Sequence, residues 1–240
     1  MSSSINVAVV SFPGSNGDHD ALHALSEDLG HETHLVDYRE SNLDRFDAVV
    51  LPGGFSYGDA LRAGAIARFS PVMPAIREFA NSGLPVLGIC NGFQVLCESH
   101  LLPGALLRNK SLRFVCLWTH IRIENTTSIW TNQLSNGEIL RLPVAHGQGA
   151  FFIDADGLRG IEDNGQIVAR YVNAAGNIDA STNPNGSLDD IAAISNAAGN
   201  VVGLMPHPER ATNSLVGGED GRQLLKHIAA SVSSRLQLTV

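Results

Sequence analysis

The sequence predicts an α/β fold in which helices flank a central, mostly parallel sheet with a small antiparallel extension. Up to residue 92, short β-rich apolar runs alternate with segments of helical spacing, which is the pattern of right-handed βαβ units. Residues 112–154 instead contain short strands split by polar turns, as in an antiparallel ribbon. With 44% hydrophobic residues, a chain of 240 residues can bury one large core. We therefore expect a single domain over residues 5–235 and a loose C-terminal tail at 236–240.

Apolar periodicity gives the order of the elements. Strands are expected at 5–12, 33–36, 47–51, 85–89, 112–117, 121–123, 138–142 and 166–171, followed by a hairpin of 191–195 and 201–204. Helices are expected at 21–29, over most of 60–80, after residue 92 and over about 219–235. Pro71 and Pro74 are expected to break the second of these helices.

The charge balance and the cysteine count limit the classes of function. The chain has 24 acidic and 16 basic residues, and a formal net charge of −8 argues against a nucleic-acid-binding surface. Because it contains no apolar run of about 18 residues and no basic segment leading into one, we expect no membrane span, no signal peptide and a cytoplasmic location. Three cysteines fit a reducing compartment better than a disulfide framework.

Residues 84–96, LPVLGICNGFQVL, contain the strongest chemical signal. Cys90 lies between Gly88 and Gly92 at the junction of an apolar strand and a helix, which is the nucleophile-elbow pattern with cysteine in place of serine. The flanking glycines are needed because a Cβ would crowd so sharp a turn. Backbone N–H groups at the start of the helix stabilise a thiolate and a developing oxyanion. The alternative is a buried cysteine with a purely structural role.

A candidate base and its orienting group stand late in the chain, in His207-Pro208-Glu209. Alternate residues of an extended segment project to the same side, and Pro208 favours an extended conformation at His207. Glu209 is then able to accept from one imidazole nitrogen while the other nitrogen faces a thiol. The alternative is a solvated histidine and glutamate beside turn prolines. Together with the elbow, this segment predicts a Cys90–His207–Glu209 triad.

Three further loops contain ligand-binding signals. The glycine-rich loop 52–59 suggests backbone brought close to a ligand, and the loop 13–18 follows the first strand, where open α/β sheets bind ligands. The loop 13–18 lacks the GxGxxG dinucleotide pattern. The loop 143–149, PVAHGQG, combines glycines with polar side chains. His19 and His23 share a helical face, but no third ligand stands nearby, so no metal site is expected.

These motifs resemble the class I glutamine amidotransferases, and the resemblance implies their flavodoxin-like fold. It covers nearly the whole chain in the right order and is strongest to glutaminase subunits that serve purine synthesis. The segments that carry it are PGSN (13–16), LPGGFSYGD (51–59), LRAGAIARF (61–69), PVLGICNGFQVL (85–96), LLPGALLRN (101–109), PVAHGQG (143–149), NPNGS (183–187), GLMPHPER (203–210) and EDG (219–221). Gly17 and Gln148 depart from it, since many relatives have Cys and Glu at these positions.

The resemblance implies a role for each matching residue. Cys90 is the implied nucleophile on the side-chain amide of glutamine, with His207 as its acid–base partner and Glu209 holding that histidine. The implied oxyanion hole consists of the backbone N–H groups of Gly54 and Asn91. The other implied substrate-binding residues are Gly53, Phe55, Ser56, Gln94, His146, Gly147 and Gln148.

The resemblance also implies partners. Released ammonia is useful only if it stays out of bulk water, so the chain is expected to dock on a large ATP-dependent synthetase, commonly together with a small accessory subunit. The implied synthetase converts formylglycinamide ribonucleotide to the amidine in purine synthesis. ATP and magnesium are expected on that synthetase and no cofactor on this chain, which has no phosphate-binding loop. Docking is expected to gate the site, so the isolated chain should be a weak glutaminase.

Three alternatives stay open at the level of the sequence. In the first alternative, the chain is a glutaminase that serves another synthetase, such as one that makes a pyridoxal precursor or a guanine nucleotide. A cysteine hydrolase or peptidase on a similar sheet would usually take its acid–base partners from other positions. A non-catalytic binding domain would have no need for Cys90, His207 and Glu209 together.

Overall fold

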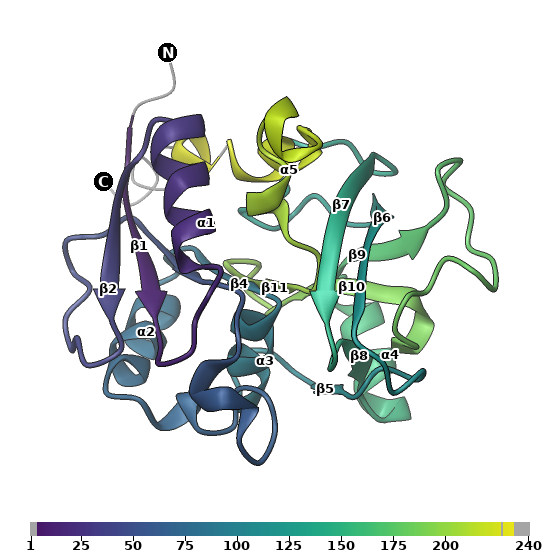
Figure 1. Ribbon diagram of the computed structural model, residues 1–240, viewed down its shortest axis with the longest axis horizontal. Helices are drawn as coiled ribbons and strands as arrows, with labels where there is room; N and C mark the ends of the chain where they lie inside the picture. Colours follow the sequence, from purple (N-terminus) through teal and green to yellow (C-terminus); the bar gives the residue numbers. More distant parts are fainter. Residues whose placement is uncertain (1–3, 227, 233–240) are drawn as a thin grey trace.

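The computed structural model describes residues 4–226 and 228–232, and its centre is a nine-stranded mixed sheet (Figure 1). The strands are β1 (Asn6–Ser11), β2 (Glu32–Asp37), β3 (Ala48–Leu51), β4 (Val86–Ile89), β5 (Ala105–Leu107), β6 (Val115–Ile123), β7 (Ile139–His146), β8 (Ala150–Phe152), β9 (Ile167–Val172), β10 (Ile191–Ser195) and β11 (Val201–Leu204). Across the large sheet their order is β2-β1-β3-β4-β11-β10-β9-β6-β7, and β5 pairs with β8 in a separate sheet. The tail expected at 236–240 lies outside the described residues.

Helices lie around the strands on both sides of the long sheet (Figure 1). They are α1 (Asp18–His23), α2 (Val72–Asn81), α3 (Asn91–Glu98), α4 (Ala155–Asp163) and α5 (Asp220–Leu225). Residues 228–232 are also helical, in agreement with the helix expected over 219–235. Within the described part of the chain, every helix is too short or too polar to cross a membrane.

Parallel pairing joins β2, β1, β3, β4 and β11 in that order. Every residue of β3, β4 and β11 is buried, because a parallel strand inside a covered sheet packs on both faces. This is why these segments are continuous apolar runs rather than alternating ones. The carboxyl ends of parallel strands meet at one edge, so the loops 13–18, 52–59, 88–92 and 205–210 converge there.

The predicted fold class is confirmed, and the antiparallel part continues the main sheet through β10, β9, β6 and β7. The expected hairpin is present as β10 and β11. The prediction of separate strands at 112–117 and 121–123 is wrong, because β6 runs unbroken from Val115 to Ile123. Thr119 and His120 suggested a turn, but both pair with β7.

The helix predicted over most of 60–80 is present as an α-helix only from Val72 onward, after a short 3₁₀ helix at Ala67–Phe69. Residues 60–66 form turns, in which Gly64 (φ 79°) comes so close to α3 that a Cβ would lie 2.8 Å from the Val95 nitrogen. Pro74 does not break α2, because it is the third residue of the helix, where a missing N–H costs no helical hydrogen bond. The helix α4 was not predicted, since two glycines weaken its periodicity, although Asp154 caps it by accepting from Gly157 N–H.

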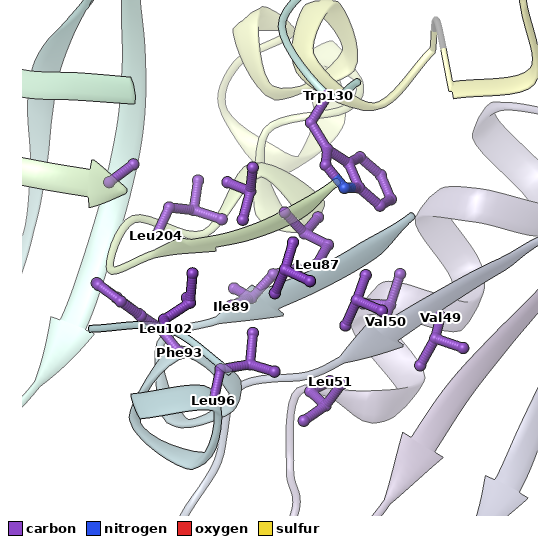
Figure 2. Close-up of a cluster of buried hydrophobic side chains, with 14 of the residues drawn as sticks. Val49, Val50, Leu51, Leu87, Ile89, Phe93, Leu96, Leu102, Trp130 and Leu204 are labelled. Atoms are coloured by element: carbon purple, nitrogen blue, oxygen red, sulfur yellow. The ribbon is translucent and has the colours of Figure 1, made fainter. Parts of the chain in front are cut away.

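A dense core lies beneath the carboxyl edge of β4 (Figure 2). It combines side chains from β3, β4, β11 and α3, each at most 3% exposed, among them Leu51, Leu87, Ile89, Phe93 and Leu204. Fully burying one such side chain is worth roughly 1.5–3 kcal/mol. The turn between β4 and α3 therefore rests on a well-packed floor.

We expect Gly92→Ala to lower the free energy of unfolding by about 1–3 kcal/mol, because overpacking forces the backbone apart. A Cβ at Gly92 would lie 2.0 Å from the Leu51 carbonyl oxygen. Urea denaturation followed by circular dichroism measures the change. The matched control is Gly160→Ala in α4, where a Cβ meets nothing within 4 Å. That variant should gain up to about 1 kcal/mol from helix propensity, and equal losses in both variants would contradict the argument.

Candidate active site

Cys90 lies at the turn between β4 and α3 and has a strained backbone. Its φ of 51° and ψ of −101° fall outside the ordinary regions for a residue with a Cβ, at a cost of about 1–3 kcal/mol. The surroundings impose this conformation, since Cys90 N–H donates to the Leu204 carbonyl at 2.8 Å. A Cβ at Gly88 would lie 2.5 Å from Leu96 Cδ1, and Gly92 has no room either. Both flanking glycines are needed, as the sequence pattern predicts.

His207 and Glu209 follow β11, the strand next to β4, and their side chains are paired. The Nδ1–H of His207 donates to Glu209 Oε1 at 2.6 Å, and both side chains are buried. The main chain is fixed as well, because His207 N–H donates to the Pro143 carbonyl of β7 at 2.8 Å. A Cβ at Gly53 would lie 2.7 Å from His207 Cε1 and 3.7 Å from Cys90 Cβ. The three residues of the predicted triad therefore come together beside Gly53.

The electrostatics favour a charged imidazole at His207. Burial lowers its pKa, but the negative charges of Glu209 and Cys90 outweigh burial, and the pKa is raised from 6.5 to about 10. No described atom meets Nε2 with hydrogen-bond geometry, so Cys90 acts on the ring chiefly through its charge. Arg210 adds a weaker contact, with its Nε 3.7 Å from Glu209 Oε1 and 2.9 Å from Asp20 Oδ2.

The glycine-rich loop after β3 is attached to the loop after β1. Gly17 N–H donates to the Gly53 carbonyl, and Phe55 N–H donates to the Gly14 carbonyl, each at 3.0 Å. A Cβ at Gly17 would lie 3.2 Å from the Gly53 carbonyl oxygen, so a larger residue at this position would need a small adjustment. These bonds hold the two loops together at the carboxyl edge of the sheet.

Two backbone donors near Cys90 are not used by the described part of the chain. Gly54 has a φ of 149°, and a Cβ there would lie 2.8 Å from the Asn16 nitrogen, so glycine is required. Neither Gly54 N–H nor Asn91 N–H has an acceptor among the described residues. Asn91 is the first residue of α3, where N–H groups have no partner inside the helix. Both groups are therefore available to an anion.

A chain of amides links the loop 52–59 to the loop 143–149 through the first turn of α3. Ser56 N–H donates to Asn91 Oδ1 at 3.1 Å, Asn91 Nδ2 donates to Gln94 Oε1 at 2.8 Å, and Gln94 Nε2 donates to the Gln148 carbonyl at 2.5 Å. Both Asn91 and Gln94 are buried. Sequence reasoning missed the side chain of Asn91, because its contact with a loop 35 residues away gives no local signal.

The loop 143–149 approaches Cys90 through its backbone. The Cys90 Sγ lies 3.7 Å from the Ala145 carbonyl oxygen. The ring of His146 is buried and contacts Asn109 Oδ1 at 3.1 Å and Asn185 Nδ2 at 3.4 Å. Burial and the positive His207 lower the pKa of His146 to about 4, so its ring is neutral near pH 7. The ring predicted to bind substrate thus lies within a network that supports the loop.

Of the remaining predicted residues, Phe55 is exposed and Ser56 is buried. The Phe55 side chain is 43% exposed, and its ring centroid is 6.4 Å from that of Phe114. The Ser56 hydroxyl is buried and has no hydrogen-bond partner among the described residues. Cys90, His207 and Glu209 are 5%, 2% and 4% exposed, so the triad is assembled but covered.

The described residues contain no group of three or more His, Cys, Asp or Glu side chains that would hold a metal ion. His19 and His23 therefore have no third ligand in this part of the chain. The three cysteines are free: Cys90 and Cys97 are buried, and Cys116 is exposed on β6. Burial raises the pKa of Cys97 well above its usual value, which leaves this thiol unreactive.

The sequence and the fold both match known proteins. The family model of the CobB/CobQ-like glutamine amidotransferase domain matches residues 4–220. The phosphoribosylformylglycinamidine synthase subunit PurQ of Thermomicrobium roseum is 59% identical, over 92% of this chain and 94% of that protein. PurQ of Salinibacter ruber is 51% identical, over 96% and 98%. The structure of PurLQS from Thermotoga maritima has a TM-score of 0.82 and 42% identity, over 98% of this chain and 100% of that chain.

A more distant structure shares the fold alone. A glutamine amidotransferase from Thermotoga maritima has a TM-score of 0.57 at 17% identity, over 98% of both chains. The family match covers nearly the whole chain and includes the elbow, the glycine-rich loop and the segment of His207 and Glu209. The chain belongs to the CobB/CobQ-like glutamine amidotransferase family, and it is an enzyme of that class.

Proposed function

We propose that this chain is the glutaminase subunit of a phosphoribosylformylglycinamidine synthase. It hydrolyses glutamine to glutamate and passes the ammonia to an ATP-dependent synthetase that converts formylglycinamide ribonucleotide to formylglycinamidine ribonucleotide. The observation that carries the proposal is the pairing of Cys90, His207 and Glu209 in a chain that is 59% identical to a PurQ subunit over almost its full length.

Cys90 forms the covalent intermediate. Its Sγ attacks the side-chain carbonyl carbon of glutamine, and an S–C bond forms as the C–N bond of the amide breaks. The proton held by His207 goes to the leaving nitrogen, which departs as ammonia. Water then attacks the thioester, gives a proton back to His207 and releases glutamate with the free thiol. Glu209 supports the cycle because its carboxylate keeps the imidazole oriented and readily protonated.

The oxyanion of each tetrahedral intermediate is met by Gly54 N–H and Asn91 N–H. Both groups are without acceptors in the described part of the chain. Gly54 lies on the glycine-rich loop and Asn91 at the start of α3, and the bond from Ser56 N–H to Asn91 Oδ1 joins these two segments. Donors that are oriented in advance cost no reorganisation when charge develops, and removing one such donor typically costs about 2.7–4 kcal/mol.

Glutamine is held by the loops on either side of Cys90. Gly53 and Phe55 supply one wall, and the backbone of Gly147 and Gln148 supplies the other. The structure supports a backbone role for the second loop, because the ring of His146 is taken up by Asn109 and Asn185. Gln94 Nε2 fixes this loop by donating to the Gln148 carbonyl. The Ser56 hydroxyl has no hydrogen-bond partner among the described residues, so it can bind a ligand.

The partners follow from the chemistry of the product. Ammonia becomes protonated and diluted in water, so the chain docks on a large synthetase, together with a small accessory subunit. The support is the likeness to PurLQS over the whole chain. ATP and magnesium bind to the synthetase. The three free cysteines suit a reducing compartment, in keeping with a cytoplasmic location.

Cys90→Ala should abolish formation of the amidine from glutamine and leave formation from ammonium salts intact. The reason is that the synthetase takes ammonia from either source, whereas only the thiol releases it from glutamine. The assay mixes the chain with purified synthetase, ATP, magnesium and formylglycinamide ribonucleotide. The control is Cys116→Ala on the exposed face of β6, which should retain both activities.

Two results of that assay would sink the proposal. Glutamine-dependent turnover in Cys90→Ala would show that Cys90 is not the nucleophile. Coupling to a synthetase for a guanine nucleotide or a pyridoxal precursor, but not to this one, would assign the chain to another amidotransferase. A glutamine-like chloroketone adds a direct check, because it should modify Cys90 and spare Cys97 and Cys116.

Glu209→Gln should lower the pKa of His207 from about 10, because burial then acts without the opposing carboxylate charge. A raised pKa stabilises the folded state fully below about pH 6.5, and that contribution is lost as the pH rises toward 10. The variant should therefore lose stability at pH 6.5 and show a flatter decline between pH 6.5 and 10. Urea denaturation across this pH range measures the free energy of unfolding. The control is Glu124→Gln, which removes a carboxylate that pairs with Arg122. An unchanged slope in Glu209→Gln would refute the pairing.

A further inference from the structure

Asn109 is fully buried between β5 and β6, and its side chain makes four hydrogen bonds. Its Nδ2 donates to the carbonyls of His146 at 2.8 Å and Arg113 at 2.9 Å. Its Oδ1 accepts from Gly149 N–H at 3.0 Å and contacts His146 Nδ1 at 3.1 Å. Its backbone N–H also donates to the Gly147 carbonyl at 3.0 Å.

These contacts use the whole hydrogen-bonding capacity of the side chain. An asparagine offers two N–H donors and two lone pairs on oxygen, and each of the four has a partner here. Aspartate has the same shape but no donor, so it would place an acceptor against the carbonyls of His146 and Arg113. Few other side chains can satisfy this site, although none of its contacts includes Cys90, His207 or Glu209.

The ring of His146 completes the arrangement. Its pKa is lowered to about 4, so near pH 7 the ring has one N–H and one acceptor nitrogen. Nδ1–H donates to Asn109 Oδ1, and Nε2 accepts from Asn185 Nδ2 at 3.4 Å. Asn185 Nδ2 also donates to the Tyr171 hydroxyl at 3.2 Å, which ties the loop to β9.

The loop that Asn109 holds reaches the nucleophile by two routes. The Ala145 carbonyl, next to the clamped residues, lies 3.7 Å from Cys90 Sγ. The Gln148 carbonyl accepts from Gln94 Nε2. The Oε1 of Gln94 in turn accepts from Nδ2 of Asn91, the residue after Cys90. A shift of the loop would thus move the glutamine-binding wall and would loosen the amides beside the elbow.

We propose that Asn109 is a positioning residue for the glutaminase reaction, which sets the geometry of residues 146–149 and so controls how glutamine is presented to Cys90. The inference rests on the proposed role of this loop in binding glutamine. Because the Asn109 side chain also binds the Arg113 carbonyl, it joins the wall of the site to the segment that exposes Phe114.

The test compares Asn109→Asp with Asn200→Asp in the complex with the synthetase. Asn200 is a matched control, since it is also fully buried and its Nδ2 donates to two carbonyls, those of Ala80 and Leu84, at 2.8 Å each. It lies at the amino end of β11, away from Cys90. We expect Asn109→Asp to lower kcat/KM for glutamine about 10- to 100-fold, mainly through KM, with ammonia-dependent synthesis unchanged. Asn200→Asp should lose stability and keep kcat/KM within about twofold.

A second readout separates positioning from general loss of structure. Inactivation of Asn109→Asp by the glutamine-like chloroketone should slow in proportion to kcat/KM, whereas alkylation of Cys90 by iodoacetamide should not change. Asn109→Ser keeps one hydroxyl donor, so its kcat/KM for glutamine should lie between those of wild type and Asn109→Asp. This variant replaces Asn109→Asp in the test if Asn109→Asp does not fold. Equal slowing of both reagents, or a kcat/KM within about twofold of wild type in both Asn109 variants, would overturn the proposal. Failure of the chloroketone to label wild-type Cys90 would instead refute the proposed function itself.

Discussion

The active site depends on the close approach of α3 to the parallel sheet at Gly92. The helix backbone meets the Leu51 carbonyl there with no room for a Cβ, and the turn before it is short enough to force Cys90 to a positive φ. A conformation that costs about 1–3 kcal/mol persists only when the surroundings impose it. The packed core beneath β4 does so (Figure 2), and the neighbouring strands β3 and β11 then deliver Gly54 and His207 to the same edge.

Neutral amides hold the rest of the site together. Asn91, Gln94, Asn109 and Asn185 are arranged around Cys90 and its loops, and each is bonded to protein. Burying further ions would be costly, and each new charge would shift the pKa of His207. Because amides are neutral, they fix the geometry without changing the charge interactions among the imidazole of His207, Glu209 and Cys90. The site thus separates groups that carry charge from groups that only set position.

Much of the fold was predictable because its signals are local. The elbow glycines, the apolar parallel strands and the hairpin before His207 all follow from short-range sterics and burial. The unbroken course of β6 was not predictable, because its polar residues at 119–120 pair with residues far away in the sequence. The turns at 60–66 were likewise decided by contact with α3. In the site, the resemblance indicated Cys90 and its partners. The segment 101–109 belongs to the resemblance, but it assigned no role to Asn109, because most partners of this side chain lie 37 to 40 residues away along the chain.

The position of Gln94 has a chemical consequence. This enzyme of glutamine hydrolysis carries a glutamine of its own, four residues after the nucleophile and buried in the same site. Its carbonyl oxygen accepts from Asn91 Nδ2, and its nitrogen donates to Gln148. Because this oxygen is bound by Asn91 Nδ2, it is not directed at the N–H groups of Gly54 and Asn91, which have no acceptor in the described part of the chain. The substrate amide and this amide of the protein are thus chemically identical and differ in the groups that bind their oxygens.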